Sequence, residues 1–280
     1  MGNLQSHRYI VCYSGGHSSA LVAIESVRKY GKENVILLNH DISSHVEHAD
    51  IKRFKVDVAE YLGLPITYAN AEDFEQMTPI AVSLRKKAFS VGNGRCFCTH
   101  HLKTYPFEKW IKKHFPVPAP GHMVHDDVTI LYGFDAKEWQ RAQRRRGILL
   151  ELGYDSDYPL AWKERTISAT EEIGIKRPQT YDTWLHANCQ GCLKAGKQHW
   201  YVVYCLRPDI WEEAKTAESV LGHSIIKNHF LHELEEQFEY MKNTLEILPT
   251  DKTPSAQFWK RVKNTLPEQL TIFSCDWCAI

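Results

Sequence analysis

The sequence predicts an α/β fold: an open, mostly parallel sheet flanked by helices, followed by a helical C-terminal region. Short apolar runs alternate with segments of helical periodicity near the N-terminus, which is typical of a parallel sheet with crossover helices. From about residue 206 onward, polar segments with helical spacing follow one another. We therefore expect an α/β domain over residues 1–205 and a helical region over residues 206–280.

The first elements follow from hydrophobic spacing. Apolar positions at i, i+3, i+4 and i+7 predict two amphipathic helices, and continuous apolar runs predict buried parallel strands. The expected strands span residues 8–12, 34–41 and 64–70, and the helices between them span 18–30 and 48–62.

The later elements are less regular. We expect a loop through the glycine-containing stretch 89–101 and another around 180–200, and helices or strands between them. Helices are expected at 102–115, 136–147 and 168–175, strands at 127–134 and 158–162, and C-terminal helices at 208–222, 229–248 and 255–266.

Composition limits the function classes. The 280 residues are 43% hydrophobic and 24% charged, and Lys plus Arg equals Asp plus Glu at 34 each, so overall charge predicts no polyanion partner. The longest apolar runs are far shorter than a membrane span, and the first residues lack the apolar core of a secretory signal. We expect a cytoplasmic protein without a membrane partner.

The stretch "YSGGHSSA" (13–20) lies between the first predicted strand and the first predicted helix. Glycines there let backbone N–H groups point toward an anion, and the start of the helix adds its positive dipole end. Neither the Walker pattern nor G-x-G-x-x-G is present, so neither of those phosphate-binding motifs is indicated. The candidate phosphate-binding residues are Ser14, Gly15, Gly16, His17, Ser18 and Ser19.

The loop "SGGHSS" resembles the S-G-G-x-D-S pyrophosphate-binding loop of the PP-loop ATP pyrophosphatases, with Ser18 where that family has Asp. "CTHHLKTYPFEKWI", "LYGFDAKEWQRAQRRR", "YPLAWKERT" and "HANCQGCLKAGKQHW" resemble, in the same order, segments of the phosphoadenosine phosphosulfate (PAPS) reductase-like group. The resemblance covers about residues 8–220. It implies an adenine nucleotide alpha hydrolase-like fold that binds ATP, or PAPS or adenylyl sulfate (APS), with Mg²⁺.

The resemblance also implies roles for residues outside the loop. Lys103, Arg141 and Arg145 would bring positive charge to the nucleotide phosphates, and Gly133 would form the turn before the arginine-bearing helix. Asn39 and His40 end the second predicted strand, where adenine and ribose would be recognised chiefly by the backbone. His17 stands at the variable position of the loop, and its ring could bind phosphate or remain a solvated turn residue.

Four cysteines form two close pairs, Cys96 with Cys98 and Cys189 with Cys192. Two such pairs could ligate a [4Fe–4S] cluster or a tetrahedral zinc, or act as redox thiols. Cys12 and Cys205 lie in apolar runs and are expected in the core.

The last pair, Cys275 and Cys278, lies in the tail "CDWCAI". PAPS reductases carry a nucleophilic cysteine in their C-terminal tail, which suggests a catalytic role for Cys275. The Glu, Gly and His that surround that cysteine in the family are absent here. A redox dithiol, a persulfide carrier or extra metal ligands are the other readings.

These observations predict an enzyme that couples adenylation and pyrophosphate release to sulfur transfer through a cysteine-bound cluster. One alternative is an APS or PAPS reductase that releases sulfite with thioredoxin as partner. Another is a non-catalytic nucleotide-binding module with structural zinc. The partners implied are an adenine nucleotide, a sulfur donor such as a cysteine desulfurase, a nucleic-acid acceptor and a second copy of the chain.

Overall fold

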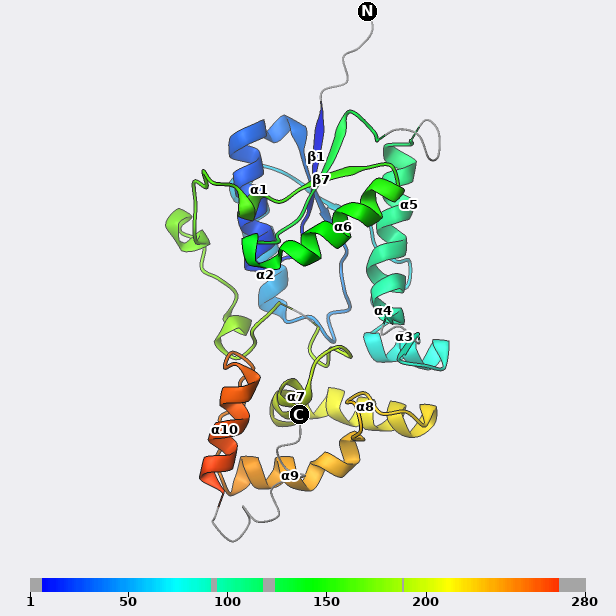
Figure 1. Ribbon diagram of the computed structural model, residues 1–280, viewed down its shortest axis with the longest axis vertical. Helices are drawn as coiled ribbons and strands as arrows, with labels where there is room; N and C mark the ends of the chain where they lie inside the picture. The colour runs from blue at the N-terminus through cyan, green and yellow to red at the C-terminus, as the bar shows by residue number, and fades with distance from the viewer. Residues whose placement is uncertain (1–6, 92–94, 118–123, 188, 267–280) are drawn as a thin grey trace, which may run out of the picture. The chain divides into compact units, whose positions relative to one another are not determined.

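The structure is a computed structural model that describes residues 7–91, 95–117, 124–187 and 189–266 (Figure 1). The chain divides into two compact units. The first contains residues 1–41, 49–72 and 102–178, and the second contains 42–48, 73–101 and 179–280. The expected boundary after residue 205 therefore falls inside the second unit, within the last turn of helix α7 (Lys197–Leu206).

A five-stranded parallel sheet forms the centre of the first unit, which confirms the predicted fold class. Its strand order is β3-β2-β1-β6-β7. The strands are β1 (Arg8–Cys12), β2 (Val35–Asn39), β3 (Ile66–Tyr68), β6 (Val128–Leu131) and β7 (Asp155–Asp157). Because every strand is parallel, all the carboxyl ends lie at one edge of the sheet.

Helices cover both faces of this sheet, as side-chain alternation along the strands requires. Val11 of β1 packs with the helices α1 (His17–Tyr30) and α2 (Ala49–Leu62). Its neighbour Ile10 belongs to a separate cluster with the helices α5 (Tyr105–His114) and α6 (Trp139–Glu151).

The second unit is mainly helical. Its longer helices are α3 (Pro79–Lys86), α7, α8 (Pro208–Leu221), α9 (Leu231–Asn243) and α10 (Ser255–Thr265). Aromatic side chains fill its core, with Trp200, Trp211 and Phe238 at most 1% exposed. The three helices expected after residue 206 are thus confirmed. Among the described residues, no helix of either unit is long and apolar enough to cross a membrane.

Two predicted elements after residue 157 need correction. The strand expected at 158–162 is wrong: the fifth strand is β7, and Pro159–Ala161 forms a 3-10 helix, η4. Pro159 has no N–H to donate to a sheet, and the polar stretch Asp-Ser-Asp of β7 gives no apolar signal. The helix expected at 168–175 is only a 3-10 turn, η5 (Thr170–Ile173).

The predicted loops also contain regular structure. Within 89–101, β4 (Ser90–Val91) pairs antiparallel with β5 (Arg95–Cys96), and a short helical turn, α4 (Phe97–Thr99), follows. Both paired segments have only two residues, too few to show a periodic pattern. The loop expected around 180–200 ends where α7 begins at Lys197.

Candidate functional site

The turn between β1 and α1 requires glycine at position 15. Gly15 has φ +80°, and a Cβ added there would lie 3.0 Å from Ile51 Cγ2 of α2. A side chain would therefore be strained by the backbone and would also crowd α2. Gly16 caps α1, which begins at His17, so the chain passes directly from strand to helix.

The turn lies at the point where the strand order of the sheet reverses. β1 has β2 on one side and β6 on the other, so the connections after β1 and after β6 leave in opposite directions. Gly133, in the turn after β6, approaches the backbone of this loop closely. A Cβ at Gly133 would lie 3.2 Å from Ser18 Cβ and 3.3 Å from Ser18 C. Open α/β sheets bind their ligands at such a reversal of strand order.

The hydroxyls of the turn are divided between structure and solvent. Ser19 is buried, and its hydroxyl donates to the Gly16 carbonyl at 2.8 Å. Ser14 and Ser18 are exposed, and Ser14 Oγ lies 3.3 Å from Ser19 Oγ. The first turn of α1 contains no acidic residue. Exposed hydroxyls beside the positive end of a helix dipole suit an anion.

His17 lies beside η5. Its Nε2 accepts the Thr170 N–H at 3.4 Å. Burial lowers the pKa of His17, and the charges of Arg177 and Arg165 lower it further against an opposing effect of Glu171. The ring is therefore neutral at pH 7 and contributes no positive charge to the loop.

Asn39 and His40 use their side chains to join strand ends. Asn39 is 1% exposed, and its Nδ2 donates to the Tyr13 carbonyl at 2.5 Å. His40 Nδ1 lies 2.5 Å from the Ala69 carbonyl. Burial lowers the pKa of His40; the Ala69 carbonyl opposes this change, and the charge of Lys103 adds to it. The backbone of this strand end is engaged as well: the Asn39 carbonyl accepts the Ala69 N–H at 2.9 Å, and the Asp41 N–H donates to Asn70 Oδ1 at 2.7 Å.

A buried ion pair beneath the loop escaped the sequence analysis. The Lys55 side chain is 2% exposed, and its Nζ lies 2.9 Å from Asp41 Oδ1 and 3.5 Å from Asn39 Oδ1. Its Cδ would lie 3.2 Å from a Cβ on Gly15. The buried Lys55 side chain thus packs against the loop at Gly15. The available signal was a lysine four residues after Ile51, inside the apolar stripe of the helix expected at 48–62.

Asp41 supplies the counter-charge. Burial alone would raise the pKa of this carboxyl, but the hydrogen bond and charge of Lys55, together with Lys52, hold it below its ordinary value. The Lys52 Nζ lies 3.2 Å from the same Asp41 Oδ1. The pair is therefore charged at neutral pH.

The predicted cations have different settings. Arg145 lies with its guanidinium 5.4 Å from the centre of the Tyr132 ring, at the end of β6. Arg141 is exposed, lies 4.8 Å from the Phe134 ring and pairs with Glu138. Lys103 is exposed, in a turn of π-helix over His100–Thr104.

Cys12, at the end of β1, stays a thiol. Burial raises its pKa to about 11, although the hydrogen bond to Tyr132 and the charge of Arg145 act in the opposite direction. It belongs to the packing around β1, as expected, rather than to a thiolate site.

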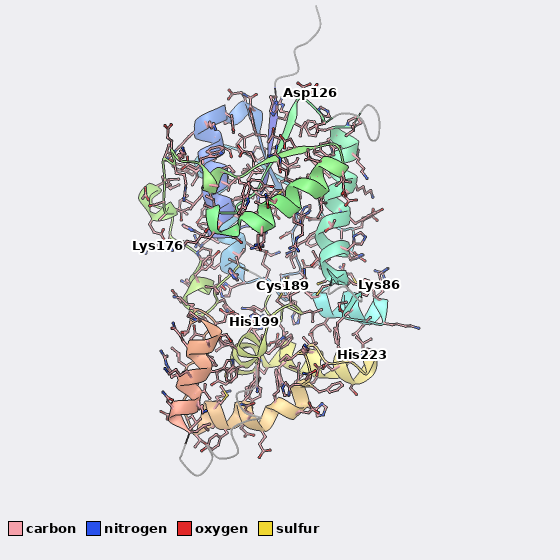
Figure 2. The ribbon with its side chains drawn as sticks, viewed as in Figure 1. Lys86, Asp126, Lys176, Cys189, His199 and His223 are labelled. Atoms are coloured by element: carbon pink, nitrogen blue, oxygen red, sulfur yellow. The ribbon has the colours of Figure 1, made fainter. Side chains whose placement is uncertain are left out.

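The four paired cysteines all belong to the second unit, where Cys189 and His199 are labelled in Figure 2. Cys96 is buried in its core, and Cys98 and Cys189 pack against that core. Burial raises the pKa of Cys96, while the Lys194 charge and a hydrogen bond from Cys98 lower it and Cys192 raises it.

The "CQGC" turn is held by contacts on both sides. Gly191 has φ +75°, and a Cβ there would lie only 2.5 Å from Ile210 Cγ2. The Cys192 N–H donates to His199 Nε2 at 3.3 Å, and His199 Nδ1 lies 3.0 Å from Asp251 Oδ2. The sequence analysis singled out neither His199 nor Asp251, because they bear no regular spacing to the cysteines.

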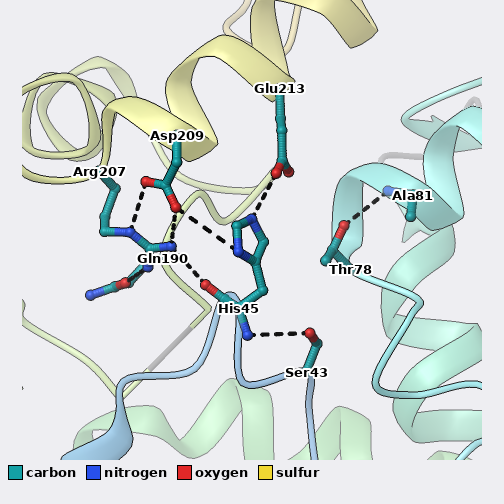
Figure 3. Close-up of polar contacts among 8 residues, drawn as sticks. All are labelled: Ser43, His45, Thr78, Ala81, Gln190, Arg207, Asp209 and Glu213. Carbon is teal, nitrogen blue, oxygen red and sulfur yellow. Dashed lines mark hydrogen bonds and ion pairs between the residues drawn. The ribbon is translucent and has the colours of Figure 1, made fainter.

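A cluster of polar side chains holds Gln190, which directly follows Cys189 (Figure 3). The Gln190 N–H donates to the Val46 carbonyl at 2.8 Å, and Arg207 donates to the Gln190 side chain. Arg207 also donates to the His45 carbonyl at 2.8 Å and pairs with Asp209. The segment 42–48 is thereby tied to the turn.

The thiols suit a metal in their chemistry, since four soft sulfur donors from two short segments share one unit. Within the described ranges, however, no group of three or more His, Cys, Asp or Glu side chains forms a ready-made ligand set. Cys275 and Cys278 lie outside the described residues.

Comparison with protein-family models found no match, and no curated protein matches the chain. The likeness to PAPS reductase-like proteins therefore stays a prediction that rests on the quoted segments.

Proposed function

We propose that the first unit binds an adenine nucleotide at the carboxyl edge of its sheet, with the phosphates on the loop 14–19. The observation that carries this proposal is the switch in strand order at β1 and β6, where the loop 14–19 meets the turn after β6. There Gly133 brings the turn after β6 against the backbone of Ser18, in a helix whose first turn has no acidic residue. A dinucleotide motif and a Walker lysine are both lacking, so a PP-loop site is the phosphate site that fits.

The proposed reaction is adenylation. An acceptor oxygen attacks the α-phosphorus of ATP, the bond from that phosphorus to the bridging oxygen breaks, and pyrophosphate leaves with the electron pair. The acceptor's proton passes to solvent. Lys103 and Arg145 would offset the charge on the phosphates, and Mg²⁺ would be held by phosphate oxygens. The buried Lys55, paired with Asp41, holds the loop in place at Gly15.

The second part of the proposal concerns sulfur. Cys96, Cys98, Cys189 and Cys192 would hold a [4Fe–4S] cluster, with a tetrahedral zinc as the alternative. When bound, a cluster would supply sulfur-transfer chemistry to the activated acceptor. The protein's own contribution is to hold the "CQGC" turn through Gly191, His199 and Arg207.

Two other functions remain candidates for specific reasons. A sulfonucleotide reductase would use Cys275 as nucleophile and thioredoxin as partner. A nucleotide-binding module without catalysis is favoured by Ser18 in place of the family's Asp, since a hydroxyl binds Mg²⁺ less well than a carboxylate.

The first test is nucleotide binding by calorimetry with ATP, AMP and PAPS, followed by measurement of AMP and pyrophosphate release. We expect ATP to bind and Gly133→Val to abolish binding, because the new side chain would meet Ser18. Gly174→Ala is the matched control, since nothing lies within 4 Å of the added Cβ. Sulfite release from PAPS would favour the reductase, and binding without AMP would favour the module.

The second test is the metal content after anaerobic purification. About four irons and four sulfides per chain would support the cluster. A single zinc without sulfide would remove sulfur transfer from the proposal and leave adenylation in place.

A further inference from the structure

A cavity of about 630 Å³ lies beside the edge strand β7 of the first unit. One face of α6 lines it with Trp139, Gln143, Arg146 and Gly147, which recur at helical spacing. Because α6 begins after β6, Trp139 stands at the same edge of the sheet as the loop 14–19. The volume is in the range of small-ligand sites.

Gly147 is the unexpected member of this face. It lies inside α6, where glycine lowers helix stability. No packing contact accounts for it, since a Cβ added there would find nothing within 4 Å. Glycine at position 147 is explained if a ligand in the cavity comes close to the backbone of α6.

The opposite wall carries fixed aromatic rings. The Tyr158 hydroxyl donates to the Ala142 carbonyl at 2.7 Å, and the Trp162 Nε1 donates to Asp157 Oδ2 at 3.0 Å. Trp139 lines the same cavity and is 58% exposed. Such walls suit a flat ring that stacks on aromatic side chains.

Trp162 also lines a second cavity, of about 480 Å³, on its other side. Lys29 Nζ lies 3.7 Å from the centre of a Trp162 ring. The basic residues that line the two cavities are Arg28, Lys29, Arg146 and Lys163. Among the acidic residues there, Glu25 accepts the N–H groups of Thr166 and Ile167, and Asp157 accepts from Trp162. Glu164 also lines the second cavity, and Arg146 pairs with Asp155 at 3.3 Å.

The basic character extends along α6 outside the cavity. Arg144 is exposed and has no ion pair in the described part of the chain, and Arg141 is exposed beside it. Aromatic walls that accept a ring, with the exposed Arg144 on the same helix, match the needs of a base and its flanking phosphates.

We propose that this cavity, lined by Trp139, Gly147, Tyr158 and Trp162, receives a nucleobase of a single-stranded nucleic acid. The inference rests on the proposed function in that it names the acceptor class, but binding at this cavity does not itself require ATP. A paired base cannot enter, because its ring is stacked within the duplex.

Fluorescence anisotropy with a labelled single-stranded oligonucleotide of about 12 nucleotides, in DNA and RNA forms, tests this site without nucleotide present. We expect the wild-type protein to bind, and Gly147→Ala to weaken binding at least about tenfold, because the methyl group occupies the ligand's space. Gly147→Ala should unfold at the same or a higher temperature than wild type, because alanine favours the helix. Loss of binding could then not be ascribed to misfolding.

Gln140→Ala is the control on the same helix, since Gln140 is exposed and does not line the cavity. Wild-type affinity in Gly147→Ala, equal binding of a duplex, or no binding by wild type would each overturn the inference. ATP binding, measured separately by calorimetry, distinguishes the two proposals. A protein that binds ATP and no oligonucleotide retains the proposed function alone, and one that binds only the oligonucleotide retains this site alone.

Discussion

Two turns in the molecule each contain a glycine with positive φ, and different kinds of contact hold the two turns in place. Gly15 and Gly191 both have positive φ, at +80° and +75°, and both lie against a side chain, of Ile51 and Ile210 respectively. The first turn joins a strand to a helix, so regular structure fixes its backbone donors. The second is fixed by side chains distant in sequence, chiefly His199 and Arg207. The backbone of the first turn can thus be predicted from local pattern, whereas the contacts that hold the second turn cannot.

The largest effect expected is at the thiol turn. Gly191→Ala adds a methyl group 2.5 Å from Ile210 Cγ2 and forces alanine into a left-handed conformation. We expect a loss of about 4 kcal/mol in the free energy of unfolding, from strain and overpacking together. Urea denaturation measures it. Gly174→Ala, at φ +80° with open space around it, should lose only about 1 kcal/mol. Equal losses would show that the Ile210 contact is unimportant.

Asp41→Asn should have the next largest effect, because it leaves the Lys55 ammonium buried without its counter-charge. We expect a loss of about 3 kcal/mol at pH 7. Asp57→Asn, which removes an exposed partner of Arg53 on the same helix, should cost at most about 0.5 kcal/mol.

The same substitution gives the pH dependence. The folded protein lowers the pKa of Asp41, so its contribution is fully present above the ordinary carboxyl pKa, near about 4. That contribution is lost as pH falls through the lowered value. The stability difference between wild type and Asp41→Asn should therefore shrink below about pH 4. A difference that is unchanged at pH 3 would mean that ionisation of Asp41 is not its source.

Gly15→Ala should be milder in stability and severe in binding. The added methyl group meets Ile51 Cγ2 at 3.0 Å and Lys55 Cδ at 3.2 Å, so these neighbours need to shift less than Ile210, which lies at 2.5 Å from a Cβ on Gly191. We expect a loss of about 2 kcal/mol, with ATP affinity at least about tenfold lower because the loop N–H groups are re-aimed. Calorimetry with ATP measures the second quantity. Weakened ATP binding in Gly174→Ala as well would point to a global effect.

The smallest effect is expected at His17. Its ring is neutral and accepts the Thr170 N–H, so it offers the phosphates no positive charge. ATP affinity should change by less than about threefold in His17→Gln, and by as little in wild type between pH 6.5 and pH 8. A tenfold rise in affinity on acidification, lost in His17→Gln, would show that a charged His17 binds the phosphates.

The accuracy of the sequence predictions follows the same division. Apolar runs and helical spacing located β1, β2 and β6, which lie inside the sheet, and the apolar Ile66 and Tyr68 marked the edge strand β3. The strand β7 was missed because an edge strand tolerates the polar residues Asp155 and Asp157. The glycine loop was foreseen, but the Lys55–Asp41 pair was not, because a charge inside an apolar stripe shows its partner only after folding. The contacts of His199 with Cys192 and Asp251 likewise depend on tertiary structure alone.

The division of the chain also bears on its synthesis. The polypeptide passes from one unit to the other after residues 41, 48, 72, 101 and 178, so each unit is assembled from three separate stretches. On the ribosome, every strand of the sheet has been made once residue 157 is added, whereas α10 of the second unit ends at residue 265. The earlier stretches of the second unit can therefore pack against its later helices only after those helices have been made. No single proteolytic cut can release either unit whole, and a truncated gene product ending at residue 205 would lack α8, α9 and α10.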